Sequence, residues 1–154
     1  MNTRIYCVFP ACGKTWLSYH QKDFNLRILD CDSSQFSWVC VGGRRERNPN
    51  FPANYIAHIK QNIGKYDYIF VSTHAAVREV LDKEGIDFTI VYPNMRCKAE
   101  WVGRCFIREQ NNENGCGAKV LLGNWEQWIS DCINTGFDHA EIVLHHGEYL
   151  SKIL

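Results

Sequence analysis

A lysine and a threonine near the start of the chain have the types and the spacing of a phosphate-binding site. An apolar run at 5–9 predicts a short buried strand, the segment 10–13 predicts a tight loop, and Lys14-Thr15 opens a segment predicted to be helical. The N–H groups of such a loop point toward a bound phosphate, and the start of a helix adds a positive partial charge. Lys14 would then reach the β- and γ-phosphates of a nucleotide, while the Thr15 hydroxyl would hold Mg²⁺.

The pattern departs from the full motif G-x-x-x-x-G-K-[ST] at one position, where Val8 replaces the first glycine. That glycine normally permits a sharp turn, so we expect Val8 to remain in the strand and the loop to be shorter or stiffened by Pro10. The alternative is that Gly13 only turns the chain from strand to helix. The residues expected to bind the nucleotide are Pro10, Ala11, Cys12, Gly13, Lys14, Thr15 and Trp16.

Two carboxylates at the end of the second predicted strand could act beside this loop. Asp30 and Asp32 are two residues apart, so both side chains leave the strand on the same side. Asp30 could hold Mg²⁺ through a water, and Asp32 could accept the proton of an attacking hydroxyl. The alternative is a turn and helix cap at the strand's exit. We expect Asp32, Ser33 and Arg78 to contact the acceptor, with Arg78 binding an acceptor phosphate.

A group of basic residues in the predicted helix 95–108 could close over transferring phosphates. Arg104 and Arg108 are four residues apart and share one helix face, with Arg96 and Lys98 nearby and a glycine-rich segment following. A cationic flap of this kind would neutralise developing charge and exclude water. A solvated helix face is the alternative, and the residues themselves leave both interpretations open.

The composition indicates one domain and argues against binding to nucleic acid or to membranes. The chain has 154 residues, of which 45% are hydrophobic and 22% charged, and its 17 lysines and arginines balance 17 aspartates and glutamates. A neutral chain has no general attraction for nucleic acid, so nucleic-acid binding would need a local patch. No apolar run approaches a membrane span, and the start of the chain does not resemble a signal peptide. We therefore expect no membrane partner and leave oligomerisation open.

Eight cysteines are present, but no pair has the C-x-x-C spacing of a zinc site. Several lie in apolar contexts, where free cysteine behaves as a small hydrophobic residue. A reduced, cytoplasmic chain is the expected setting. Cys12 is the cysteine whose pKa the neighbouring loop and lysine could lower, although the favoured interpretation is an arbitrary small residue of the loop.

Strands and helices alternate along the chain, which predicts an α/β fold with a parallel sheet of about five strands flanked by helices. Ligands bind at the carboxyl ends of the strands in such sheets. Residues 36–50 are expected to form a loop-rich excursion with a basic tip, and 147–154 a short terminal helix or turn. The predicted strands are 5–9, 26–32, 66–71, 87–92 and 141–144, and the predicted helices are 16–21, 51–63, 74–84, 95–108 and 118–133.

Three segments resemble known kinase families. The segment 8–15 resembles the P-loop of nucleoside monophosphate kinases, which often carry proline at the position of Pro10. The segment 29–32, Leu-Asp-Cys-Asp, resembles the D-x-D of shikimate and gluconate kinases, and 100–108 resembles the arginine-bearing LID of nucleotide kinases. The resemblance implies a three-layer P-loop NTPase fold in one domain over 1–154 with a helical LID at about 95–118, with Asp30 as a magnesium ligand and Arg104 and Arg108 as phosphate-stabilising residues.

The chain as a whole also resembles small phage-type P-loop proteins that share Asp-x-Asp-Ser-Ser, Val-Tyr-Pro and Glu-Trp-x-Gly-Arg blocks. One departure concerns the metal, because Val71-Ser72-Thr73 stands where a Walker B acid would follow the third strand. The resemblance implies ATP- and Mg²⁺-dependent phosphoryl transfer to a nucleotide, with Lys14, Asp32, Arg104 and Arg108 as catalytic residues. Two alternatives stay open: a small-metabolite or nucleoside kinase with Asp32 as base, and a nucleotide-binding regulator with little turnover.

Overall fold

A parallel sheet of five strands forms the centre of the molecule. The computed structural model describes residues 2–113, 115–135 and 138–154, and within these the strand order is β2-β5-β1-β6-β7. Every pairing between neighbours in this sheet is parallel, so the carboxyl ends of the strands share one edge. The prediction of an α/β fold with a parallel sheet of about five strands is confirmed. The strands are β1 Arg4–Val8, β2 Ile28–Asp30, β5 Tyr68–Ser72, β6 Thr89–Pro93 and β7 Ala140–Leu144.

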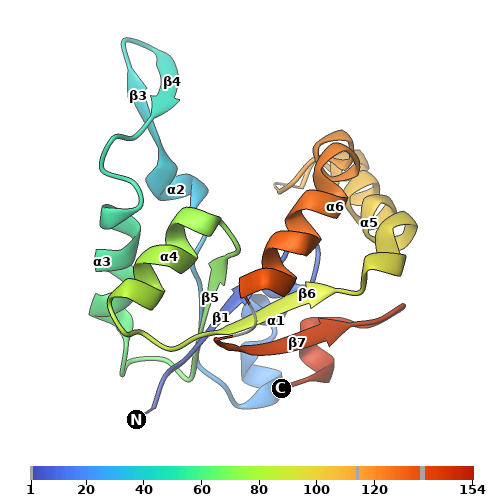
Figure 1. Ribbon diagram of the computed structural model, residues 1–154, viewed down its shortest axis with the longest axis horizontal. Coiled ribbons are helices and arrows are strands. Elements are labelled where there is room, and N and C mark those ends of the chain that lie inside the picture. The colour runs from blue at the N-terminus through green and yellow to red at the C-terminus, as the bar shows by residue number, and fades with distance from the viewer. Residues whose placement is uncertain (1, 114, 136–137) are drawn as a thin grey trace.

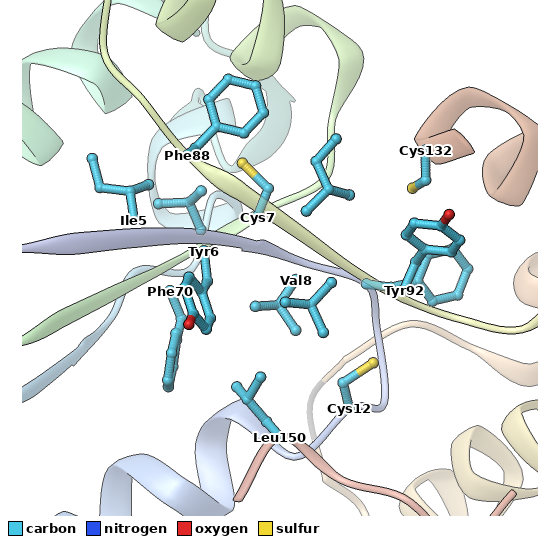
Figure 2. Close-up of a cluster of buried hydrophobic side chains, with 14 of the residues drawn as sticks. Ile5, Tyr6, Cys7, Val8, Cys12, Phe70, Phe88, Tyr92, Cys132 and Leu150 are labelled. Carbon is cyan, nitrogen blue, oxygen red and sulfur yellow. The ribbon is translucent and has the colours of Figure 1, made fainter. Parts of the chain in front are cut away.

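Helices cover both faces of this sheet, as Figure 1 shows. Side chains alternate along β1, so Cys7 points to one face with Phe88 and Cys132, while Val8 points to the other with Leu150 (Figure 2). Cys132 belongs to α6, and Leu150 to a terminal 3₁₀ turn that packs near α1. The helices are α1 Lys14–Tyr19, α2 Ser34–Ser37, α3 Ala53–Asn62, α4 Ala75–Lys83, α5 Lys98–Gln110 and α6 Ala118–Thr135, with 3₁₀ turns at Gln21–Phe24, Met95–Cys97 and Leu150–Lys152.

Burial on both faces explains why the central strands read as continuous apolar runs. In β1, all residues from Ile5 to Val8 are buried, and in β5 the same holds from Tyr68 to Val71. A strand covered by helices on both sides has no solvent-facing row, so polar alternation is absent. The strands predicted at 5–9 and 66–71 are therefore found close to their expected places. The predicted strand at 26–32 is shortened to Ile28–Asp30.

The prediction of a loop-rich excursion at 36–50 is wrong, because this segment contains a β-hairpin. Strands β3 Trp38–Val41 and β4 Arg44–Arg47 pair antiparallel around Gly42 and Gly43. Both glycines have positive φ, 57° and 79°. A two-residue hairpin turn requires such angles at both central positions, and two glycines adopt them without steric cost. In Figure 1 the hairpin projects away from the sheet and its helices.

The helices have lengths typical of a globular α/β domain. Among the described residues, none is long and apolar enough to span a bilayer. The longest is α6, whose buried residues Leu121, Trp125, Ile129 and Cys132 lie on one face. It packs against α5. Most of the segment 95–118, which was predicted to be a LID, lies in α5.

Candidate functional site

The loop between β1 and α1 is short and begins only after Val8. Val8 is the last residue of β1, is 1% exposed, and pairs with both Ser72 and Val91. The left-handed conformation that a first glycine would supply occurs instead at Ala11, with φ of 61°. A second left-handed residue, Gly13, precedes α1 with φ of 93°. The chain therefore turns sharply twice between strand and helix without the missing glycine.

Consecutive backbone N–H groups in this loop have no acceptor in the described part of the chain. The N–H groups of residues 11–16 donate no hydrogen bond there, and the first bonded one is Leu17 N, which donates to Gly13 O at 3.0 Å. A left-handed residue followed by a helical one, as at Gly13 and Lys14, turns successive N–H groups toward a common point. Such a concavity favours an anion, and a phosphate would satisfy these donors.

The two predicted metal ligands are in direct contact. The Thr15 hydroxyl donates to Asp30 Oδ2 at 3.1 Å. Thr15 is at the start of α1 and Asp30 is the last residue of β2, and helix and strand pack against each other. A hydroxyl and a carboxylate side by side are oxygen ligands of the kind that Mg²⁺ takes together with waters and phosphates. Their contact is the central geometric feature of this site.

Lys14 lies beside this pair and is available to a ligand. Among the described residues it forms no ion pair or side-chain hydrogen bond. Burial raises the pKa of the Cys31 thiol to about 11, and the nearby charge of Lys14 opposes that rise. Exclusion of water lowers the pKa of His74, and the charges of Arg47, Lys14 and Arg78 lower it further. The charge of Lys14 thus acts on groups that follow β2 and β5, and among the described residues no carboxylate pairs with its ammonium.

The ends of β2 and β5 are joined by a tyrosine of α3 that the sequence analysis did not single out. Tyr55 is fully buried, and its hydroxyl donates to Cys31 O at 2.6 Å and accepts from Ser72 N at 3.3 Å. The Ser72 hydroxyl is buried and has no hydrogen-bond partner among the described residues. An unpaired buried hydroxyl costs about 1–3 kcal/mol, so it marks a place where a ligand or its water could add a bond.

Asp32 and Ser33 follow β2 and begin a turn. Asp32 Oδ1 accepts from Ser34 N at 2.9 Å, which is the turn that the sequence offered as an alternative to catalysis. The Asp32 side chain is exposed and its second oxygen has no partner in the described chain, so the turn does not exclude a role in accepting a proton. Ser33 is buried at 7% exposure, and its carbonyl starts α2.

The Arg104 guanidinium group is hydrogen-bonded to the loop between β1 and α1. It donates to Ala11 O at 2.9 Å, to Glu148 O at 2.8 Å and to Glu100 Oε2 at 2.8 Å. The group also lies 3.7 Å from the ring centroid of Trp101 and 3.9 Å from that of Tyr149. With its side chain only 9% exposed, Arg104 joins α5, the loop and the end of the chain. In this state it positions the loop, and a contact with phosphate requires those bonds to change.

The C-terminal segment covers one side of the same loop. Leu150 N donates to Cys12 O at 2.9 Å, and Gly147 N donates to Glu100 Oε1 at 2.9 Å. A Cβ at Gly13 would lie 3.2 Å from Tyr149 Cδ1, which is a tight contact. The i,i+4 spacing of Glu100 and Arg104 could have suggested their ion pair. No local sequence signal predicts that residues 147–150 pack against the loop between β1 and α1.

The Arg78 side chain forms no hydrogen bond with the loop between β1 and α1 in the described part of the chain. Its guanidinium donates to Thr73 O at 3.0 Å, to Asp131 O at 3.0 Å and to Thr135 Oγ1. The residue is 4% exposed and lines a small hollow of about 140 Å³ between α4 and the residues Asn134, Thr135, Asp138 and His139, and no residue of the β1–α1 loop lines it. Arg78 therefore connects α4 to α6 here. Its predicted contact with an acceptor phosphate stays a prediction and requires these bonds to break.

Three other predicted residues are Arg108, Trp16 and Pro10. Arg108 follows Arg104 by one turn of α5, packs against the backbone of Gly115, and its Nε has no partner among the described residues. It is the arginine of this pair that is not engaged by the loop. Trp16 is 51% exposed on α1, and its ring stacks on His20 at 4.0 Å. Pro10 is half-buried, and its carbonyl accepts from the Cys12 thiol at 3.7 Å.

Cys12 is an inert thiol in this structure. The residue is fully buried, and burial raises the pKa of its thiol to about 12, although Lys14 and Arg104 act in the opposite direction. The lowered pKa that its place in the loop suggested is therefore wrong, and a small buried residue is the better description. The reason is that Leu150 and α5 cover the loop from the side where water would otherwise enter.

No protein-family model matches this chain, and no curated protein matches it either. Within the described residues, no group of three or more histidine, cysteine, aspartate or glutamate side chains is arranged to hold a metal alone. A magnesium ion carried by a nucleotide needs fewer protein ligands, because phosphates and waters fill most of its positions. The donor set of Thr15 and Asp30 fits that kind of ion.

Proposed function

We propose that the protein is an ATP-dependent phosphotransferase whose acceptor is a nucleotide, a (deoxy)nucleoside monophosphate. The observation that carries this proposal is the contact between Thr15 and Asp30 at the carboxyl edge of the sheet. It is supported by the free N–H groups of the loop, the unneutralised Lys14 and the buried unpaired hydroxyl of Ser72. In open α/β sheets ligands bind at this edge, and phosphoryl transfer needs the donors, cation and metal ligands found there.

Each residue has a defined part in this proposal. The loop N–H groups and Lys14 bind the β- and γ-phosphates of ATP, and Thr15 and Asp30 hold the Mg²⁺ that accompanies them. The metal neutralises charge on the transferring group. Arg108 adds positive charge from the proposed LID, and Arg104 holds the loop in its binding shape. The rate enhancement then comes from positioning and charge neutralisation. The proposed fold is of the P-loop type, and the proposed location is cytoplasmic.

A second candidate is a kinase for a nucleoside or another small alcohol. The observation that favours it is the contrast between Arg78, which is buried and engaged by α6, and Asp32, whose carboxylate is exposed. An alcohol acceptor needs a carboxylate to take its proton, whereas a monophosphate needs a cation to bind it. A nucleotide-binding regulator with little turnover is a third candidate, favoured by Ser72 at the end of β5 where an acid would hold the metal.

The experiment that separates these candidates is a screen for transfer of the labelled γ-phosphate of ATP. The wild-type protein is incubated with Mg²⁺ and three acceptor groups: nucleoside monophosphates, nucleosides, and small hydroxyl metabolites. Labelled nucleoside diphosphate is the result expected from the proposal. Label on nucleosides or metabolites alone would move the assignment to the second candidate. ATP binding without transfer of label to any acceptor would support the third candidate, a nucleotide-binding regulator.

A further inference from the structure

Two cysteines meet where the second half of α5 packs against the turn that precedes α6. Cys105 lies on α5 and is fully buried, and Cys116 is a half-buried residue two positions before the start of α6. The two helices lie side by side (Figure 1). The two thiols are hydrogen-bonded to each other, and the Cys116 thiol also lies 3.6 Å from Gly117 O. Neither cysteine has a part in the proposed phosphoryl transfer.

The meeting of the two cysteines follows from the way the turn packs on α5. Cys105, Arg108 and Glu109 stand at i, i+3 and i+4, so they share one face of the helix. Glu109 Oε1 accepts from Ala118 N at 2.6 Å, and the Arg108 guanidinium packs against the backbone of Gly115. This face of α5 therefore contacts the chain on both sides of the second cysteine, which places the two thiols together independently of their own hydrogen bond.

The surroundings of the pair favour a thiolate and a disulfide over a metal. The hydrogen bond with Cys116 lowers the pKa of the Cys105 thiol, and the charges of Arg108 and Arg104 act in the same direction, against the effect of burial. A thiolate is the form that attacks a disulfide sulfur. A metal is less suited, because among the described residues no third histidine, cysteine, aspartate or glutamate is placed to complete a site with these two.

We propose that Cys105 and Cys116 form a redox modification site, which a low-molecular-weight disulfide oxidises to an intramolecular disulfide. In the first step a thiolate of the pair attacks one sulfur of the small disulfide, forms a mixed disulfide and releases one small thiol. The other cysteine then loses its proton and attacks the protein sulfur of the mixed disulfide, and a second small thiol leaves. The protein loses two electrons and two protons, and the small disulfide gains them as two thiols. Disulfides of this transient, redox-sensing kind occur in otherwise reduced compartments.

The disulfide fixes the turn at 115–117 to α5. A covalent bond then replaces the hydrogen bond between the two thiols, so the turn no longer separates from the helix. Arg108 packs against Gly115 in this turn, and its Nε has no partner among the described residues. A turn that stays in place keeps Arg108 against it and away from a phosphate, so the oxidised protein is the slower one. This last consequence rests on the proposed function, whereas formation of the disulfide does not.

The test is oxidation of the folded protein with oxidised glutathione, followed by peptide mapping without reductant. The variant Cys40→Ser is used throughout, because it lacks the exposed thiol that would cross-link two copies. Trypsin cuts after Arg104, Arg108 and Lys119, so the two cysteines fall in the separate peptides 105–108 and 109–119. We expect these peptides to appear as one linked species that dithiothreitol separates. The oxidised protein should melt at least about 4 °C higher, because the closed loop restricts the unfolded chain.

The matched control adds Cys116→Ser, a small polar replacement at a half-buried position, to the same background. It should keep the melting temperature of the reduced protein within about 2 °C and form no linked peptides under oxidation. Two thiols that stay reduced, a mixed disulfide with glutathione that never resolves, or a link between other cysteines such as Cys7 and Cys132 would each overturn the proposal. An oxidised protein that melts at the same temperature as the reduced one would show that the turn is not fixed.

The consequence for Arg108 has its own measurement. Phosphoryl transfer by the oxidised protein should be at least about threefold slower than by the reduced protein and should recover with dithiothreitol. Equal rates, with the linked peptides present, would remove the effect on the proposed reaction. Failure of the proposed function appears separately, as a reduced protein without transfer, and the peptide map and the melting temperature still decide whether the disulfide forms.

Discussion

Thr15 Oγ1 lies 3.1 Å from Asp30 Oδ2, and this hydrogen bond joins the first turn of α1 to the end of β2. Thr15 is exposed and Asp30 is half-buried, and both lie at the carboxyl edge of the sheet. Together they present a hydroxyl and a carboxylate beside the unpaired ammonium of Lys14. This is an arrangement in which a nucleotide and its Mg²⁺ gain partners that the chain itself does not use.

The substitution Asp30→Asn should abolish the magnesium dependence of ATP binding. Asparagine can still accept the Thr15 hydrogen bond, so the local structure is kept while the negative charge is lost. We expect at least about a tenfold loss of ATP affinity in Mg²⁺ and little change without it. Calorimetric titrations with and without Mg²⁺ measure this. The exposed Asp23, in the turn after α1, supplies the control Asp23→Asn, and an equal effect of both substitutions would contradict a metal role for Asp30.

The substitution Arg104→Ala should weaken both the fold and nucleotide binding. It leaves the acceptors at Ala11, Glu148 and Glu100 without their shared donor and opens the space between two rings. Breaking a largely buried ion pair of this kind costs roughly 3 kcal/mol of unfolding free energy. Denaturant unfolding gives that value, and ATP titration gives the second effect.

Arg96 provides the control for this substitution, because it is exposed and its side chain forms no hydrogen bond or ion pair with the described residues. Arg96→Ala should leave unfolding within about 0.5 kcal/mol of the wild type. An Arg104→Ala variant that is as stable as Arg96→Ala would show that the guanidinium is not the connection between α5, the loop and the chain end.

The substitution Gly13→Ala should destabilise the loop. Gly13 has φ of 93°, a conformation that costs an alanine about 1–2 kcal/mol, and the added methyl would press on Tyr149. The melting temperature should fall accordingly, and ATP affinity should fall with it. Gly123, inside α6 with open space around it, gives the opposite control: Gly123→Ala should raise stability by up to about 1 kcal/mol. A neutral Gly13→Ala would mean that the loop does not need this backbone angle.

Cys12 should resist alkylation in the folded protein. Burial raises its pKa to about 12, so the thiol stays protonated at neutral pH and is a poor nucleophile. Cys40, on the exposed hairpin, should react readily. Mass spectrometry of peptides after brief iodoacetamide treatment measures both. Rapid modification of Cys12 under native conditions would show that the loop opens to water.

The strands and the turn between β1 and α1 were predictable because their signals are local. Apolar runs such as 66–71 reflect burial on both faces, and the Lys14-Thr15 pair after a strand predicts the turn that the structure contains. The sequence predicts only that Thr15, which follows β1, and Asp30, which ends β2, lie at the same edge of the sheet. The sequence could not give their direct contact, since that depends on how α1 packs against β2.

The parts that were missed depend on contacts between distant segments or on an overlooked turn signal. The hairpin was signalled by Gly42-Gly43 between two short β-like runs, and its composition was mistaken for a loop. The engagement of Arg104 and Arg78 could not be foreseen, because their partners lie at Glu148 and Asp131, far along the chain. The sequence does not distinguish a helical arginine that binds a phosphate from one that donates to a backbone carbonyl.

The most direct test of the account is steady-state formation of nucleoside diphosphate from ATP, Mg²⁺ and a nucleoside monophosphate, with wild type and Lys14→Ala measured side by side. The account predicts turnover that requires the monophosphate and falls by at least about a hundredfold in Lys14→Ala, because that variant lacks the cation at the transferring phosphate. Wild-type protein that gives no diphosphate with any monophosphate, or a Lys14→Ala variant as active as the wild type, would contradict the central claim.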